Sequence, residues 1–327
     1  ATATGLPAHR VARLGVARSL FLTPPAPVDE LKKLLPAAEI EYDGAYTPAE
    51  SALLAQRSDV AIVFAVRVEG EAFDLTDLSL PWGQDAVIDA VVAANPNTIV
   101  VLQTGNPVSM PWRDKVKGIV QAWFPGQAGA TAIAEVLTGK VSPSGHTPIT
   151  WPAELADTPR PTMPILATKW GTPVTLRFDE GAEVGYRWYA MTGRTPMYPF
   201  GLGLSYRKFD YGGLQLRGGD NVTVQLTVRN SGARAGADVP QLYLTRAPDG
   251  QRMRLLAFEK VTLEPGESKA VTLTGDPRLL GRYDERAGRW RLAAGDYEVM
   301  VGKSGGEPVL TGRVRLDGRA LGKQSYS

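Results

Sequence analysis

The stretch DVAIVFAV, residues 59–66, is a short continuous apolar run that is rich in β-branched residues. Such a run predicts a strand that is buried on both faces, as in a parallel sheet covered by helices. Residues 83–95 carry one apolar helical stripe, and two more apolar runs, at 97–105 and 117–126, predict further strands. Residues 129–140 predict a second helix, which ends at a glycine. This order of elements predicts an α/β sandwich, with a mostly parallel sheet flanked by helices.

The second half of the chain has a different pattern. Residues 221–232 (NVTVQLTVRNSG) alternate with a period of two, and similar short runs follow, separated by Gly, Pro, Asp and Asn. This spacing predicts an all-β sandwich of roughly 110 residues. A stretch rich in Pro, Thr and Trp lies between the two halves. We therefore expect an α/β domain at residues 1–150, an extended connecting segment at 151–205 and an all-β sandwich at 206–327.

Composition excludes several classes of function. The chain has 327 residues, 43% of them hydrophobic, so it can bury a sizeable core. Its net charge of +2 includes no large basic block, and no apolar run reaches membrane-helix length, so we expect neither nucleic acid nor a membrane as partner. It has no cysteine, which excludes disulfides and thiolate chemistry. With two histidines in all, we expect no metal and no cofactor.

Two motifs outside the acidic stretches could carry chemistry. His146 lies in the turn-like stretch PSGHTP, for which we expect a structural role. The stretch GLGLSY, residues 201–206, lacks the full G-x-G-x-x-G pattern and precedes no predicted helix, so it predicts a backbone turn and not a nucleotide loop.

An acidic stretch, RVEGEAFDLTDLSLP at residues 67–81, comes directly after the first predicted strand. In open α/β sheets ligands bind beyond the carboxyl ends of strands, so these residues fall where a site is expected. Glu71 lies between Gly70 and Ala72, which leaves its side chain sterically open. From residue type alone, two interpretations stay open: a solvated loop acid or a carboxyl group used for catalysis.

Four long stretches together resemble the C-terminal part of glycoside hydrolase family 3, the β-glucosidase and β-xylosidase family. They are residues 59–112, 122–152 (AWFPGQAGATAIAEVLTGKVSPSGHTPITWP), 183–206 (EVGYRWYAMTGRTPMYPFGLGLSY) and 255–274 (LLAFEKVTLEPGESKAVTLT). The resemblance implies an α/β sandwich followed by a fibronectin-III-like domain. It also implies a preceding (β/α)8 barrel, which needs about 250 residues and is absent from this chain.

The resemblance also implies a site. Family members carry stretches similar to S-G-E-G-Y-D-R, and the matching residues here are E-G-E-A-F-D-L. This match places Glu71 at the position of the general acid/base, with Glu69 as the alternative, and the family's nucleophile is an Asp on the barrel. Phe73 is expected to contact the sugar or the barrel, and Asp74 to fix the loop, so both are candidate substrate-binding residues. Leu75 stands where an Arg is common in the family.

Two tryptophans near this loop could stack on a sugar ring. Trp82 and Trp112 are residues of a type that more often packs in a core than binds a sugar. We therefore expect packing roles for both.

The function implied is that of the C-terminal part of a retaining, exo-acting β-glycosidase, with β-glucosidase as the first choice. The chain would supply the acid/base to a nucleophile on a separate barrel chain or on a missing N-terminal part of a longer or nicked enzyme. Expected substrates are β-glucoside or β-xyloside oligosaccharides or aryl glycosides; a homodimer is compatible with the sequence. We expect a periplasmic or secreted location, with the cytoplasm as the alternative. A non-catalytic carbohydrate-binding or structural module is the competing hypothesis, and an unrelated α/β hydrolase or binding protein is the third.

Overall fold

The computed structural model describes residues 2–4, 25–71, 75–162 and 172–322. The chain divides into two compact units, the first built mainly on Ala1–Val141 and the second on Thr175–Ser327. The shorter stretches between them are divided: Ala153–Leu155 and Thr162–Val174 join the first unit, and Ser142–Pro152 and Ala156–Pro161 join the second. The three-part division of the chain at residues 150 and 205 stays a prediction.

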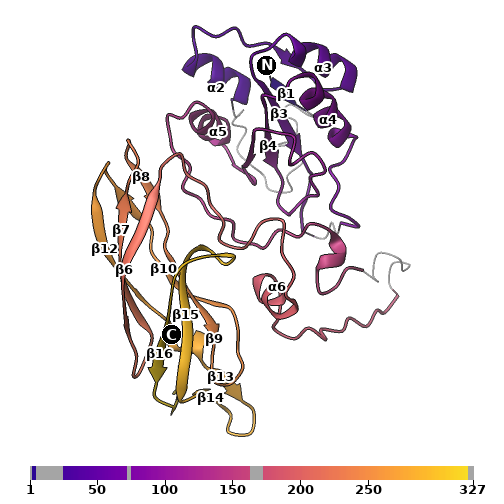
Figure 1. Cartoon of the computed structure of the whole chain (residues 1–327). Helices are drawn as coiled ribbons and strands as arrows, with labels where there is room; N and C mark the ends of the chain where they lie inside the picture. The colour runs from indigo at the N-terminus through magenta and orange to yellow at the C-terminus, as the bar shows by residue number, and fades with distance from the viewer. Residues whose placement is uncertain (1, 5–24, 72–74, 163–171, 323–327) are drawn as a thin grey trace. The chain divides into compact units, whose positions relative to one another are not determined.

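The first unit is built on a five-stranded, fully parallel sheet with strand order β2-β1-β3-β4-β5 (Figure 1). Its strands are β1 (Thr2–Thr4), β2 (Tyr42–Asp43), β3 (Ala61–Val66), β4 (Thr98–Gln103) and β5 (Gly118–Gln121). The predicted strands at 59–66, 97–105 and 117–126 are therefore confirmed, the last in a shorter form.

Among the described residues, four helices accompany this sheet: α2 (Pro27–Leu34), α3 (Pro48–Gln56), α4 (Gln84–Ala94) and α5 (Gly129–Leu137). Thr47 is the N-cap of α3: its hydroxyl accepts a hydrogen bond from the N–H of Glu50 and donates one to the Glu50 carboxylate. Helices α3 and α4 lie together on one side of the sheet, and α2 and α5 pack against each other on the other side (Figure 1).

Alternation along the strands divides the core of this unit between the two faces. Phe64 of β3 and Val101 of β4 pack with Ile133 of α5. Their neighbours Val63 and Leu102 are equally buried and point to the opposite face, which α4 covers. Burial on both faces explains why these strands read as continuous apolar runs.

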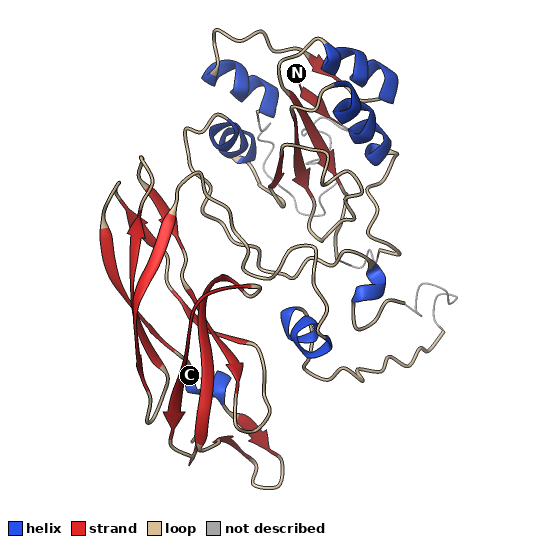
Figure 2. Ribbon diagram, viewed as in Figure 1, coloured by secondary structure: helices blue, strands red, loops and turns tan. Residues whose placement is uncertain are grey.

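The second unit is an antiparallel β-sandwich (Figure 2). Its four-stranded sheet has the order β10-β9-β15-β16, and its principal three-stranded sheet the order β12-β7-β6. The strands of these two sheets are β6 (Phe209–Arg217), β7 (Thr223–Asn230), β9 (Gln241–Arg246), β10 (Arg254–Phe258), β12 (Ser268–Thr274), β15 (Gly295–Ser304) and β16 (Glu307–Leu316).

Smaller elements complete the second unit and the connecting segment. The short strands are β8 (Gly236–Asp238), β11 (Val261–Leu263), β13 (Arg282–Asp284), β14 (Arg289–Leu292) and β17 (Arg319–Ala320). The helical turns are η2 (Leu155–Asp157), α6 (Tyr186–Thr192) and α7 (Pro277–Leu280). Helix α6 ends at Gly193, whose φ of +67° suits a helix C-terminus.

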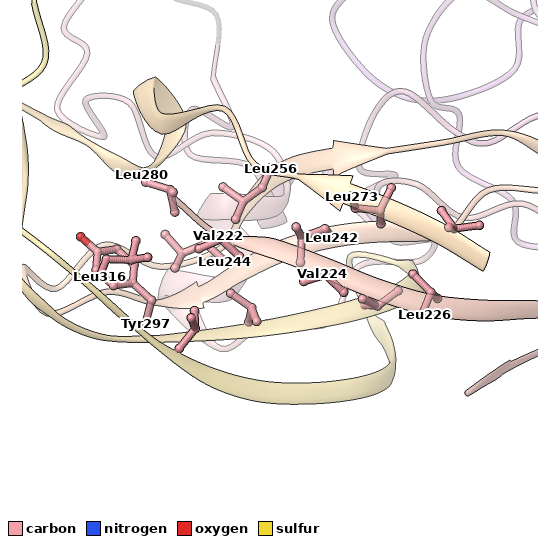
Figure 3. Close-up of a cluster of buried hydrophobic side chains, with 14 of the residues drawn as sticks. Val222, Val224, Leu226, Leu242, Leu244, Leu256, Leu273, Leu280, Tyr297 and Leu316 are labelled. Carbon is pink, nitrogen blue, oxygen red and sulfur yellow. The ribbon is translucent and has the colours of Figure 1, made fainter. Parts of the chain in front are cut away.

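One hydrophobic core joins the two sheets of the sandwich (Figure 3). The period-two residues Val222, Val224, Leu226 and Val228 are each at most 2% exposed. They pack against residues of the opposing sheet, among them Leu244. The alternation in residues 221–232 therefore predicted the buried face correctly.

Candidate active site

The candidate site begins where strand β3 ends, at Val66. The side-chain amide of Gln84, at the start of α4, holds this residue at two points: Oε1 accepts from the Val66 N–H at 2.8 Å, and Nε2 donates to the Val66 carbonyl at 2.7 Å. The next main-chain bond runs from Arg67 N to the Gln103 carbonyl at 3.3 Å and extends the pairing of β3 with β4 by one residue. The acidic residues therefore leave the sheet from a fixed point.

The side chain of Glu69 is buried and bonded to the main chain that comes after β4. Its side chain is only 4% exposed. Its Oε2 accepts hydrogen bonds from the N–H groups of Gly105 and Asn106, the latter at 2.9 Å. Its Oε1 lies 3.6 Å from Nε of Arg67, whose side chain is also buried. Its carboxylate thus serves as a structural bridge between the two strand ends.

Arg67 links the same segment to residues further along the chain. Its Nη2 donates to the carbonyl of Asp77 at 2.6 Å. The N–H and hydroxyl of Ser79 are the main groups that hold the pKa of Asp77 below its usual range, and the Arg67 charge adds to this effect. Two buried atoms of the pair, Arg67 Nη1 and Glu69 Oε1, have no hydrogen-bond partner among the described residues.

Glu71 has the opposite environment from Glu69, although only two residues separate them. Glu71 is exposed, and none of the described residues forms a hydrogen bond or ion pair with it. Leu75, half-buried, stands where the family commonly has an Arg. Phe73 and Asp74, the candidate substrate-binding residues, lie outside the described residues. Of the predicted site residues, the structure therefore places Glu69 and Glu71 together, one buried and one open to solvent.

The aromatic residues near the strand ends differ from one another. Trp112 is fully buried, and its Nε1 donates to Asp85 Oδ1 at 2.7 Å, so the expected packing role is confirmed. Trp82 is 63% exposed, so its side chain is not part of the core and the packing role expected for it is wrong. Phe124, which comes after β5, is also exposed. The sequence did not single out Phe124, although it lies in the motif AWFPG.

Three residues with clear roles at the site were not found from the sequence: Arg67, Gln84 and Gly105. An arginine directly after a continuous apolar run was the available signal for Arg67. Gln84 and Gly105 carry no such signal, because their roles depend on contacts with residues far away in the sequence.

His146 and the stretch GLGLSY have the structural roles that the sequence predicts. His146 Nδ1 lies 2.6 Å from the Gly201 carbonyl and Gln241 Nε2 lies 3.0 Å from the same oxygen. Gly201 has a φ of +78°, so the stretch GLGLSY forms a backbone turn as predicted.

The described residues offer neither a metal cluster nor a membrane span. Within them, no group of three or more His, Cys, Asp or Glu side chains could hold a metal ion. None of the helices in the same ranges is both long and apolar enough to cross a membrane.

Fold and site together define a protein class: a parallel α/β sandwich with two glutamates just beyond the end of strand β3, followed in the chain by an antiparallel β-sandwich. The family model described as the glycosyl hydrolase family 3 C-terminal domain matches residues 8–206, and that of the fibronectin type III-like domain matches residues 238–305. The chain therefore belongs to glycosyl hydrolase family 3, and the resemblance and the fold class inferred from the sequence are confirmed.

Among curated proteins, the chain is similar to β-glucosidase B of Emericella nidulans, with 40% identity over 85% of this chain and 34% of that protein. It is also similar to thermostable β-glucosidase B of Acetivibrio thermocellus, with 39% identity over 82% of this chain and 36% of that protein. The chain thus spans about a third of the length of these relatives. Across the described ranges no (β/α)8 barrel occurs.

Solved structures of β-glucosidases are also similar to this chain. A β-glucosidase from Streptomyces venezuelae in complex with D-glucose matches with a TM-score of 0.76 and 37% identity, over 82% of this chain and 35% of that one. A β-glucosidase from Bifidobacterium adolescentis matches with a TM-score of 0.86 and 31% identity, over 100% of this chain and 51% of that one.

Proposed function

We propose that this chain is the C-terminal part of a retaining, exo-acting β-glycosidase, with β-glucosidase as the first choice. In this proposal Glu71 is the general acid/base. One observation carries the proposal: Glu71 is exposed just beyond the carboxyl end of β3, where ligands of open α/β sheets bind. The names of the relatives, which are β-glucosidases, support the substrate class.

The environment of the neighbouring glutamate supports the choice of Glu71. Glu69 is 4% exposed and its carboxylate is occupied by main-chain N–H groups. A carboxyl group in that position cannot reach a glycosidic oxygen without breaking those bonds. An acid/base must come within hydrogen-bond reach of the proton that it transfers, and Glu71 is free to do so.

The mechanism is the two-step retaining scheme. A barrel carboxylate attacks the anomeric carbon while Glu71 gives its proton to the departing oxygen, and a covalent glycosyl-enzyme forms. Glu71, now a carboxylate, takes a proton from water, and the water oxygen attacks the anomeric carbon and releases the sugar with retained configuration. The two carboxyl groups must stand roughly 5–5.5 Å apart for this reaction.

The test is Glu71→Gln in the active enzyme, meaning this chain together with its barrel portion. Turnover of substrates with poor leaving groups should fall by about 10²–10⁴-fold, because the proton donor is lost. Azide should partly restore hydrolysis of activated aryl β-glucosides, since it replaces the water that Glu71 would activate. Glu39→Gln, at an exposed glutamate of the same unit, is the matched control. Unchanged turnover in Glu71→Gln would favour the non-catalytic carbohydrate-binding or structural module.

The partner and the location are part of the same proposal. Native mass spectrometry of an active preparation should find the 35.1 kDa chain either covalently continuous with a barrel or in complex with a barrel-sized polypeptide. An active preparation that contained this chain alone would contradict the proposal. Preference between β-glucosides and β-xylosides is tested by kcat/KM on matched aryl glycosides. A periplasmic or secreted location is tested by cell fractionation.

A further inference from the structure

We propose that Glu69 is the positioning residue for Glu71, because its carboxylate ties residues 67–71 to the main chain that comes after β4. The inference rests on the proposed function of Glu71. It gives a separate role to each of two glutamates that the sequence alone left as alternatives.

The first observation is the place of Glu69 relative to the sheet. Strands β3 and β4 pair in parallel, and their pairing reaches the bond from Arg67 N to the Gln103 carbonyl. Beyond that bond the Glu69 carboxylate accepts the N–H groups of Gly105 and Asn106. The Glu69 side chain therefore connects the two strand ends at a point two residues beyond the last main-chain hydrogen bond between them. Residue 69 is therefore fixed to residues 105 and 106 through its side chain.

The second observation is that specific groups offset the cost of burying the Glu69 carboxylate. An ionised carboxylate inside a protein needs charge-assisted hydrogen bonds or a paired cation. Glu69 has two main-chain N–H donors and the Arg67 guanidinium, whose Nε lies 3.6 Å from Oε1. Arg67 is itself fixed by its bond to the Asp77 carbonyl at 2.6 Å. Each member of this set is held by another, so the conformation of residues 67–69 is specified at several points.

The third observation is the close fit at Gly105. A Cβ on this residue would lie 2.7 Å from Glu69 Oε2 and 2.8 Å from Cε2 of Phe124. Both distances are too short for real contacts, so a side chain at residue 105 would displace the carboxylate or the ring. The absence of a side chain at Gly105 is therefore what allows Glu69 to reach the main chain.

Glu71 is kept close to the end of β3 as a result. Only Gly70 separates it from the fixed residue 69, and glycine adopts many backbone conformations. Glu71 can therefore turn about Gly70 but cannot move far from the strand end. Precise placement of a catalytic group matters, since a displacement of about 1 Å can cost on the order of 10²-fold in rate.

The test compares Glu69→Gln and Gly105→Ala with Glu71→Gln in the active enzyme. Glutamine keeps the size of the side chain but removes the negative charge that faces Arg67. The matched controls are Glu39→Gln, at an exposed glutamate, and Gly212→Ala, where a Cβ would meet open space. Measurements are kcat and KM on aryl β-glucosides with good and poor leaving groups, with and without azide, and hydrogen exchange at the amides of residues 105 and 106.

If Glu69 positions Glu71, both test variants lower kcat by about 10–10²-fold on poor leaving groups and much less on good ones, with KM little changed. Azide does not rescue them, because Glu71 is still present. The amides of residues 105 and 106 exchange faster than in the controls. Neither control changes any of these quantities.

Other outcomes separate this inference from the proposed function. Normal activity in Glu69→Gln with a strong loss in Glu71→Gln would overturn the positioning role alone. An equal loss on good and poor leaving groups in both test variants would also overturn it, since a smaller folded fraction produces that pattern. Azide rescue of Glu69→Gln but not of Glu71→Gln would make Glu69 the acid/base, which overturns both proposals.

Discussion

The side-chain amide of Gln84 pairs with both main-chain polar groups of Val66, as a neighbouring strand would. The bonds are 2.8 Å and 2.7 Å long, and both partners are buried. The end of β3 is therefore fixed by a side chain from the next helix, immediately before the acidic residues of the candidate site.

Replacing Gln84 with Leu should destabilise the first unit strongly. The change leaves the N–H and carbonyl of Val66 buried without these partners, at a cost of roughly 1–3 kcal/mol for each group. Urea denaturation monitored by tryptophan fluorescence measures the loss in the free energy of unfolding. Gln127→Leu, at an exposed glutamine, is the control and should change stability little. Equal midpoints for the two variants would show that the Gln84 pairing contributes nothing.

Asp85 should make the stability of the first unit depend on pH. Burial raises its pKa, while the hydrogen bond from Trp112 Nε1 opposes the rise. A raised pKa means that the folded state holds the proton more tightly than the unfolded chain. The stability that this group contributes is thus present below its unfolded pKa and is lost as pH rises through its folded pKa.

The variant Asp85→Asn isolates this effect, because asparagine keeps an oxygen acceptor for Trp112 but does not titrate. Melting temperatures of both proteins are measured from about pH 3 to pH 7, a range that begins below the ordinary Asp pKa. We expect the wild type to lose stability relative to the variant as pH rises. Parallel curves would contradict a raised pKa at Asp85.

Much of the fold could be predicted because its signals are local. The run 59–66 is buried on both faces and the run 221–232 on one, and the period of a strand accounts directly for each pattern. Strands β1 and β2 could not be predicted in this way, since they have three and two residues and little apolar side chain. Their place in the sheet is set by pairing with neighbours that are distant in the sequence.

The candidate site was predictable only in part, because its contacts also join residues that are distant in the sequence. A family motif pointed to Glu71 and left Glu69 as the alternative, since both are glutamates in one short loop. What distinguishes them is that Glu69 bonds to residues 36 and 37 positions away, Gly105 and Asn106. No pattern within the loop encodes that partnership.

Removing the hydroxyl of Tyr211 should destabilise the second unit. In the folded protein this hydroxyl donates to Asp238 Oδ2 at 2.8 Å, and Asp238 is buried. Burial, with the Asp238 charge, raises the pKa of Tyr211, so the hydroxyl stays protonated and can donate throughout the neutral range. Tyr211→Phe should cost about 1.5–3 kcal/mol, the usual value for a hydrogen bond to a charged group. Urea denaturation checks this, with Tyr283→Phe, at an exposed tyrosine, as the control.

A side chain at residue 201 should lower the free energy of unfolding, for two reasons that can be separated by experiment. Its φ of +78° costs any other residue roughly 1–2 kcal/mol. In addition, a Cβ there would lie 2.1 Å from Gln241 Oε1 and 2.8 Å from the hydroxyl of Tyr243. Those groups belong to the network around the Gly201 carbonyl, which also includes His146.

Gly250→Ala separates the two contributions, because Gly250 has a φ of +86° but a Cβ there would meet open space. We expect Gly250→Ala to show only the backbone cost and Gly201→Ala to lose distinctly more in the free energy of unfolding, since the Gln241 side chain must also move. Thermal and urea denaturation measure both. If the two variants lost the same amount, the network around Gly201 would adapt at no cost, and the turn in GLGLSY would need glycine for its backbone conformation alone.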